Sequence, residues 1–519
     1  MSFVVAQVAG AEYEPRSSCR SGRDAARRGS FGVWELNADV YAPLSQLNAD
    51  AVYFLMSGNW KNELRSNRWH FARQWSRYLP VTMLQPELDC GAETRSESVD
   101  GIANCRLLYI RASRWGTDSW VDADQIEQVY RDMRTRNICR PILWLYNPNL
   151  VSLFATIPAV ARIVHATESY FDWEGARQTF LNKLRLCGAI ADLIIPVSSG
   201  VESCFRTNVK QSNYLLLTNG CDYETYSRGS PDQYLTDLKS NFKRIAIYAG
   251  NINERLDYQL LLRCAQSMPG VCFALFGPVS FLTLSEANLW NSVIRLPNVR
   301  YMGAVEPDRI PDLYAAADVG IIPYKETPFI RDRGFALKAL EMIAAGLPVI
   351  STMMRPMLGV SNELQVAEQS EEFLEALSKA DRSKLSSMQQ VAMREVASRY
   401  DYGRRFPDVV GATKNIIGLN PAPRARLEEY RQALSSGELG ISIGSDARVP
   451  DFCGDDPQVY LTSLMKALRV DRSVTARYLR RIRSSSLASA AHRSIISSPS
   501  ATALVRFAKN WLPSSRRSR

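Results

Sequence analysis

Histidine is scarce in this sequence, and the cysteines show no pairing pattern. Only three histidines occur among 519 residues, His70, His165 and His492, and they lie far apart. The ten cysteines run from Cys19 to Cys453 without a CxxC pair. These spacings offer neither a zinc site nor a histidine-based metal site. They favour reduced thiols in a cytoplasmic protein over a disulfide framework.

Long apolar runs are also missing. The nearest candidate, residues 151–166, is interrupted by Pro158 and Arg162, so no segment has the length of a membrane-spanning helix. Residues 1–14 carry no basic region and only a short apolar stretch, which argues against a signal peptide.

The body of the chain has no excess of either charge. The net charge of +10 arises at residues 471–519, where eleven basic residues accompany one acidic residue. A nucleic-acid-binding protein would carry its basic stripe on a folded domain, so we expect no nucleic-acid partner. An apolar stripe beside Arg506 and Lys509 predicts a basic amphipathic helix on an anionic membrane surface. A solvated tail is the alternative.

Short apolar runs alternate with helical segments along most of the chain. The predicted strands include residues 51–56, 81–86, 105–111 and 141–148, and then 243–250, 271–278, 298–305 and 319–324. Such runs are typical of parallel strands buried on both faces, and their alternation with helices indicates doubly wound α/β domains. A chain of this length is too long for one core.

We therefore divide the chain into four parts. Residues 1–45 form a loosely ordered extension, and residues 46–230 form a first Rossmann-like domain. Residues 231–417 form a second such domain, including a helix that crosses back onto the first. Residues 418–519 form a C-terminal extension with the basic tail.

One segment, residues 331–352, has the pattern of a ligand site. Lys338 and Glu341 are three residues apart in a predicted helix, which places both on one face in its first turns. Unpaired backbone N–H groups and the helix dipole favour an anion there. A cation beside a carboxylate suits a nucleoside diphosphate, with the lysine on phosphate and the glutamate on ribose. A surface ion pair is the alternative.

The neighbouring segments are expected to face the same crevice. Gly250 ends the first strand of the second domain, and the loop at residues 323–333 follows a later strand. Ligands of doubly wound sheets bind at the carboxyl ends of the strands.

Four motifs, in this order, resemble GT-B-fold glycosyltransferases of group 1, a family-4-like class that includes bacterial enzymes of exopolysaccharide and teichuronic-acid assembly. The motifs are TNGCD (218–222), YAGNINERLDYQLL (248–261), MGAVEPDRIPDLYAAADVGIIPY (302–324) and ALKALEMIAAGLPVIST (336–352). The resemblance implies two Rossmann-like domains facing a cleft, the first for an acceptor and the second for a nucleotide-sugar donor.

The resemblance assigns donor-binding roles by position. It implies that Glu341 holds the donor ribose, that Lys338 contacts the diphosphate and that Gly250 lets the backbone approach the donor. Arg255 matches the first member of an arginine–lysine pair whose second member is missing. These assignments are expectations for the second domain.

Arg333 departs from the family pattern. It stands eight positions before Glu341, where many relatives carry another glutamate, which argues against the retaining mechanism of the glutamate-pair enzymes. Arg333 or Arg331 is expected to supply positive charge to the departing diphosphate. The alternative is a surface pair with Asp332 or Glu326.

The first domain offers candidates for the acceptor side. Glu168 and His165 follow a buried strand, and a general base there would suit inversion. Glu168 is the first candidate and His165 the second. The alternatives are a solvated or capping glutamate and a buried histidine. Trp60 and Arg68 resemble a family loop at the interdomain cleft, with core packing and a surface salt bridge as alternatives.

The resemblance implies a hexosyltransferase-type glycosyltransferase. It would move a sugar from a nucleotide-diphosphate sugar to a saccharide or lipid-linked acceptor, in cell-surface polysaccharide or glycolipid synthesis. We expect no cofactor and no metal, because the nearest Asp-x-Asp, residues 122–124, is explained by helix capping. A nucleotide-sugar epimerase and a non-catalytic GT-B module remain alternatives. We expect a cytoplasmic protein, attached to the inner face of the plasma membrane if the tail binds lipid.

Overall fold

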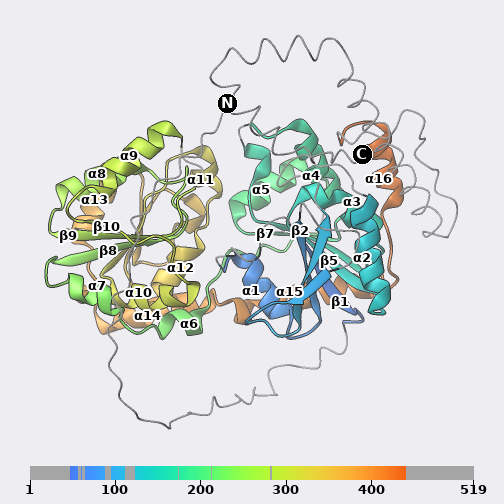
Figure 1. The fold of residues 1–519 in the computed structure, drawn as a ribbon, viewed down its shortest axis with the longest axis horizontal. Helices are drawn as coiled ribbons and strands as arrows, with labels where there is room; N and C mark the ends of the chain where they lie inside the picture. Colours follow the sequence, from blue (N-terminus) through green and yellow to red (C-terminus); the bar gives the residue numbers. More distant parts are fainter. Residues whose placement is uncertain are drawn as a thin grey trace, which may run out of the picture.

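The computed structural model describes residues 47–439, except residues 57–59, 61–62, 64, 88–94, 112–122, 174, 212 and 281–282. The described residues form two lobes, each built on a β-sheet with helices on both faces (Figure 1). None of the helices in this part of the chain is both long and apolar enough to cross a membrane. The predicted N-terminal extension and basic tail lie outside the described residues.

The first lobe contains a seven-stranded sheet in the order β3-β4-β2-β1-β5-β6-β7. Its strands are β1 (Ala51–Leu55), β2 (Val81–Glu87), β3 (Arg95–Ser98), β4 (Cys105–Arg111), β5 (Pro141–Leu145), β6 (Ala161–Ala166) and β7 (Leu193–Pro196). Neighbouring strands are parallel except β3, which runs antiparallel to β4 at the edge. β3 is not apparent in the sequence, because this exposed strand contains no apolar residue.

Continuous apolar runs form the central strands because both faces of the sheet are covered. In β1, Tyr53 and Leu55 belong to one core, whereas Val52 and Phe54 belong to the other. The first core is closed by α2 (Ala123–Thr135), α3 (Val151–Thr156), α4 (Gln178–Ile190), α5 (Ser199–Asn208) and α16 (Leu427–Ser435). The second is closed by α1 (Asn67–Trp75) and α15 (Tyr402–Leu419).

The second lobe contains a six-stranded parallel sheet in the order β10-β9-β8-β11-β12-β13. Its strands are β8 (Arg244–Ala249), β9 (Val271–Phe276), β10 (Val299–Tyr301), β11 (Val319–Ile322), β12 (Val349–Thr352) and β13 (Leu364–Ala367). One face packs on α6 (Tyr223–Ser227), α7 (Gln233–Leu238), α10 (Ile310–Ala316), α12 (Leu337–Ala344) and α14 (Ser387–Arg399). The other packs on α8 (Tyr258–Ser267), α9 (Leu284–Ile294) and α13 (Ser370–Lys379).

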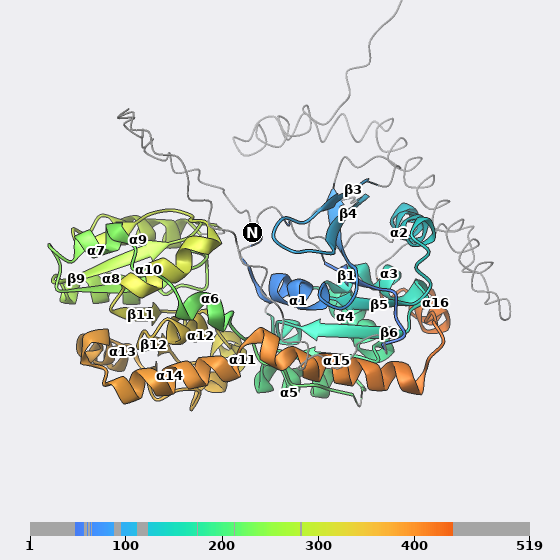
Figure 2. The same ribbon diagram turned by 90° about the horizontal axis from the view of Figure 1, so that it is seen from below.

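The chain returns from the second lobe to the first between α14 and α15. Figure 2 shows α14 beneath the second lobe and α15 continuing beneath the first. Phe406 of α15 packs edge-on against Trp75 of α1, with ring centroids 5.1 Å apart. The cross-over helix assigned to the second domain therefore contributes its apolar face to the core of the first lobe.

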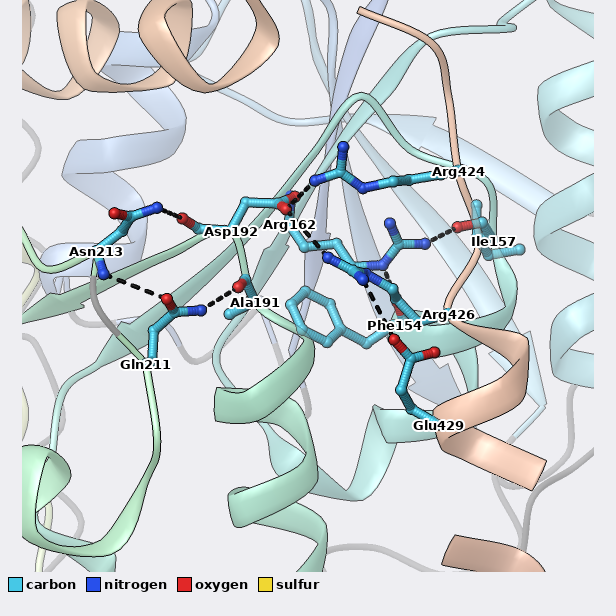
Figure 3. Close-up of polar contacts among 10 residues, drawn as sticks. All are labelled: Phe154, Ile157, Arg162, Ala191, Asp192, Gln211, Asn213, Arg424, Arg426 and Glu429. Carbon is cyan, nitrogen blue, oxygen red and sulfur yellow. Dashed lines mark hydrogen bonds and ion pairs between the residues drawn. The ribbon is translucent and has the colours of Figure 1, made fainter. Parts of the chain in front are cut away.

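Residues 420–439 also belong to the first lobe by packing. Ala159 and Arg424 exchange two backbone hydrogen bonds of 3.0 Å, and α16 buries Leu427 and Tyr430 in the first core. Figure 3 shows Asp192 beside the arginines of this return segment. The division at residue 418 thus differs from the packing. The polar residues of the segment concealed its role, because they pair with buried groups of the first lobe.

Candidate functional site

A cleft of about 580 Å³ lies between the lobes. In the first lobe its wall includes residues 146–149, which follow β5, and residues 167–170 and 173, which follow β6. In the second lobe it includes residues 251, 253 and 255 after β8 and residues 333–338 at the start of α12. These segments follow strand ends or begin a helix, where doubly wound domains bind ligands.

Five of the nine predicted site residues line this cleft. They are Arg68, Glu168, Arg255, Arg333 and Lys338. The other four, Trp60, His165, Gly250 and Glu341, are not part of its wall.

Lys338 lies at the start of α12, between two tyrosine rings. Its Nζ is 3.0 Å from the Tyr248 hydroxyl and 4.1 Å from the centre of the Tyr248 ring, and it lies 5.3 Å from the Tyr324 ring. The Tyr248 hydroxyl donates to the carbonyl of Asn251 (2.8 Å), so its oxygen accepts from the lysine. Burial lowers the pKa of Lys338, but the two tyrosine oxygens raise it above its ordinary value overall. The ammonium group therefore stays charged.

No carboxylate among the described residues lies within ion-pair distance of Lys338. A tyrosine hydroxyl orients the ammonium without cancelling its charge. Backbone N–H groups at the start of α12 add to the positive potential. This corner of the cleft is therefore suited to an anion.

Gly250 makes room for the Lys338 ammonium. Its φ is +152°, and a Cβ added there would lie 2.3 Å from Lys338 Nζ. A side chain at position 250 would displace the ammonium from the end of β8. Gly250 thus leaves space for the Lys338 ammonium, although it does not line the cleft itself.

Glu341 lies one turn beyond Lys338 but is buried behind the cleft wall. Its side chain is close to Tyr226 of α6, and the residue is 7% exposed. Burial raises the pKa of Glu341 to about 7, although the Tyr226 hydrogen bond and the Lys338 charge act in the opposite direction. The expectation that Lys338 and Glu341 both open onto the cleft is therefore met by Lys338 alone. The helix rotation between them turns Glu341 toward α6.

Two ion pairs join the segment after β6 to arginines of the second lobe that line the cleft. Arg255 Nη2 donates to Glu168 Oε1 (2.8 Å), and Arg333 Nε donates to Asp172 Oδ2 (2.8 Å). Both carboxylates come from the segment after β6, which contains the short helix η4 (Tyr170–Asp172). The Glu168 charge raises the pKa of Arg255. The two arginines expected to meet the diphosphate thus meet carboxylates of the first lobe here.

His165 lies in the core behind Tyr146. It is 2% exposed, and its Nδ1 is 3.0 Å from the Tyr146 hydroxyl. Burial lowers the pKa of His165 to about 3. Since Tyr146 lines the cleft and His165 does not, the structure places His165 as the buried histidine of the alternative interpretation. Glu168 is the candidate that reaches the cleft.

Trp60 and Arg68 have different positions. Trp60 packs against the second core of the first lobe, and its backbone N–H donates to Gln85 (2.8 Å). Arg68 lines the cleft, where its Nε lies 3.2 Å from Ser66 Oγ and 3.4 Å from a Glu63 oxygen. Core packing therefore describes Trp60, while Arg68 has both a salt bridge and access to the cleft.

Several polar residues of the cleft were not predicted from the sequence. Asn219 of the TNGCD motif donates to the Phe335 carbonyl (2.8 Å) and accepts from Asn67 (3.2 Å), which links the two lobes at the floor of the cleft. Tyr248 and Asn251 flank Gly250 and also line the cleft. Their position near Gly250, at the end of a strand, is the feature of the sequence that could have identified them.

The described residues contain no group of three or more His, Cys, Asp or Glu side chains placed to hold a metal ion. Asp122, the first residue of the Asp-x-Asp string, lies outside the described residues.

Sequence similarity to known proteins includes a family match within the second lobe. Residues 243–380 match the family model described as Glycosyl transferases group 1. The putative teichuronic acid biosynthesis glycosyltransferase TuaH of Bacillus subtilis (strain 168) is 30% identical over 138 residues. That match covers 26% of this chain and 33% of TuaH, so the chain spans about a third of that relative. The predicted resemblance to group 1 glycosyltransferases is confirmed.

Solved structures extend the likeness to both lobes. Sucrose-phosphate synthase from Thermosynechococcus elongatus has a TM-score of 0.55 and 14% identity, covering 75% of this chain and 100% of the other. HepE of Anabaena in complex with UDP and glucose has a TM-score of 0.52 and 14% identity, covering 70% and 100%. The E. coli protein solved with UDP-2-fluoro glucose has a TM-score of 0.52 and 11% identity, covering 72% and 100%. The predicted GT-B fold is confirmed.

Proposed function

We propose that the protein is a glycosyltransferase that takes a sugar from a UDP-sugar donor. The observation that carries this proposal is Lys338, a half-buried cation with no carboxylate partner among the described residues, at the start of a helix facing the cleft. A nucleoside diphosphate supplies the anion that this corner lacks. The group 1 match covers this segment, and similar solved structures hold UDP or UDP-glucose.

The chemistry requires the diphosphate to leave as negative charge builds on it. Lys338, Arg255 and Arg333 all meet that charge from the second lobe. The two arginines do so once the diphosphate replaces Glu168 and Asp172 as their partner. Fixed positive groups stabilise a departing anion most strongly where water is excluded. We propose that these side chains do the work without a metal ion.

The acceptor hydroxyl approaches from the first lobe. Glu168 is the proposed base, since it is the titratable predicted candidate that lines the cleft. A base within reach of the hydroxyl removes its proton as the new bond forms. The proposed acceptor is a saccharide or a lipid-linked sugar of cell-surface polysaccharide or glycolipid synthesis, in line with the putative role of TuaH.

A panel of nucleotide sugars tests this proposal. We expect UDP and one UDP-sugar to raise the melting temperature of the full chain, and that UDP-sugar to release UDP. An epimerase would convert the donor sugar without releasing UDP, and a binding module would bind without turnover. EDTA is expected to leave UDP release unchanged. Loss of activity in EDTA with recovery in Mg²⁺ or Mn²⁺ would overturn metal independence.

We also propose a cytoplasmic protein that reaches the membrane surface through residues 471–519. The eleven basic residues of this tail favour anionic lipid. Liposome flotation of the full chain and of a chain ending at residue 470 tests it. Equal recovery of the two would exclude the tail as a membrane anchor.

A further inference from the structure

An exposed tryptophan stands on the first-lobe wall of the cleft. Trp173 is 59% exposed, and no other aromatic side chain among the described residues is more than about a third exposed. Its backbone N–H donates to the Tyr170 carbonyl (3.3 Å), which ends the helical turn η4. The turn therefore holds an indole toward solvent inside a ligand-sized cleft. Core packing does not account for it.

Two further aromatic rings continue this surface. The Tyr170 ring lies 6.2 Å from Trp173 and 5.4 Å from Phe180 of α4, the latter edge to face. All three side chains line the cleft. We call Tyr170, Trp173 and Phe180 the aromatic shelf.

A buried lysine orients an amide beside the aromatic shelf. Lys183, one turn after Phe180 on α4, is 1% exposed, and its Nζ donates to Asn149 Oδ1 (3.2 Å). Because Oδ1 faces the lysine, the amide nitrogen is turned the other way. Asn149 lines the cleft, so it presents N–H donors there.

We infer that the aromatic shelf and Asn149 bind a sugar ring of the acceptor; this inference rests on the proposed function. A pyranose has an apolar C–H face, which covers an indole, and hydroxyl groups at its rim, which accept from an amide. The surface belongs to the first lobe, opposite Lys338, so it is separate from the proposed diphosphate site. One exposed indole flanked by amide and hydroxyl groups suits a saccharide better than a lipid chain, which would need a larger apolar area.

The test is saccharide binding by the full chain, without turnover. Fluorescently labelled protein saturated with UDP is applied to an array of bacterial and other glycans, and bound glycans are then titrated. We expect Trp173→Ala to weaken glycan affinity about tenfold and Trp173→Phe to restore most of it. Asn149→Asp keeps the Lys183 partner but removes the N–H donors, and we expect a similar loss.

Met388→Ala is the matched control, because Met388 is 82% exposed on α14, away from the cleft. Its glycan affinity should equal that of the wild type. A wild-type chain that binds no glycan, or a Trp173→Ala chain that binds as well as the wild type, overturns the inference. UDP binding measured by thermal shift on the same samples tests the proposed function separately. Glycan binding without UDP binding would overturn that function and leave the saccharide surface in place.

Discussion

Glu168 of the first lobe accepts a hydrogen bond of 2.8 Å from Arg255 of the second lobe, across the cleft. The pair joins Glu168, the proposed base, to Arg255, which is proposed to bind the diphosphate. Since the diphosphate and the carboxylate carry the same sign of charge, they compete for the same guanidinium. We therefore expect donor binding to free Glu168 for the acceptor and so to couple the two half-sites.

Glu168→Gln should slow sugar transfer without weakening the binding of the donor. The amide cannot accept the acceptor proton, so we expect kcat to fall by about 10²–10⁴-fold. UDP affinity should not fall, because the substitution removes a negative charge that competes for Arg255. Steady-state UDP release and calorimetric UDP binding measure the two quantities. Near-normal turnover would exclude Glu168 as the base.

Asp172→Asn provides the comparison for that variant. Asp172 lies in the same segment and pairs with Arg333, but it is absent from the cleft wall. We expect tighter UDP binding and a much smaller change in kcat than Glu168→Gln gives. Equal kcat losses in the two variants would indicate that the segment is required for closure rather than for proton transfer.

Lys338→Met should remove most of the affinity for the diphosphate. A charge-assisted hydrogen bond contributes about 1.5–3 kcal/mol, so we expect UDP binding to weaken by roughly 10- to 100-fold. Tyr248→Phe keeps the charge but removes the hydroxyl that orients it, and we expect a smaller loss. Lys239→Met is the control, since Lys239 pairs with Asp318 outside the cleft. Unchanged UDP affinity in Lys338→Met would contradict the proposed donor site.

We expect loss of the Glu341 proton to lower the free energy of unfolding as the pH rises toward neutrality. Burial raises its pKa from 4.5 to about 7, so the folded chain holds this proton more tightly than the unfolded chain. The stability that this proton contributes is present below about pH 4.5 and is lost by about pH 7. Glu341→Gln has no such proton. Its melting temperature should rise relative to the wild type between these values and level off above pH 7.

Glu371→Gln is the control for this pH dependence. The Arg263 hydrogen bond lowers the pKa of the exposed Glu371. Its substitution should therefore give a small trend of opposite sign below about pH 4.5, and a nearly constant difference from the wild type between pH 4.5 and 7. A difference between Glu341→Gln and the wild type that is constant from pH 4.5 to 7 would show that Glu341 titrates normally in the fold.

The sequence predicted the sheets better than the direction of site side chains. Apolar runs such as residues 51–55 reveal strands buried on both faces, since each residue contributes to one of two cores. Helix spacing placed Lys338 and Glu341 together, but it carries no information on which neighbouring helix covers each one. Packing of α6 against Glu341 decides that, and α6 is distant in the sequence.

The cross-lobe pairs were beyond prediction for the same reason. Glu168 and Arg255 are 87 positions apart, and no local pattern relates two loops on different sheets. The return segment after α15 was predicted to be part of the C-terminal extension, because its prolines and polar residues show no strand or helix pattern that would assign it to the first lobe. Its partners lie in the first lobe, more than 200 positions earlier.

Asp192→Asn should loosen the return segment from the first lobe. The Asp192 carboxylate accepts from the Arg162 backbone N–H (2.8 Å), pairs with Arg424 and lies 3.6 Å from Arg426 (Figure 3). The Arg162 guanidinium is fully buried and donates to backbone carbonyls instead. Burial lowers the pKa of Arg162 to about 9, and the nearby negative charge of Asp192 acts in the opposite direction. The variant leaves these arginines without their shared counter-charge, and we expect a loss of about 3 kcal/mol in the free energy of unfolding. Urea unfolding measures this loss, and limited proteolysis should cut residues 420–439 sooner.

Glu375→Gln, which breaks an exposed pair with Lys379, should leave the urea midpoint unchanged. If Asp192→Asn unfolds with the wild type and resists protease equally, α16 is held by its apolar face alone, and the carboxylate is dispensable.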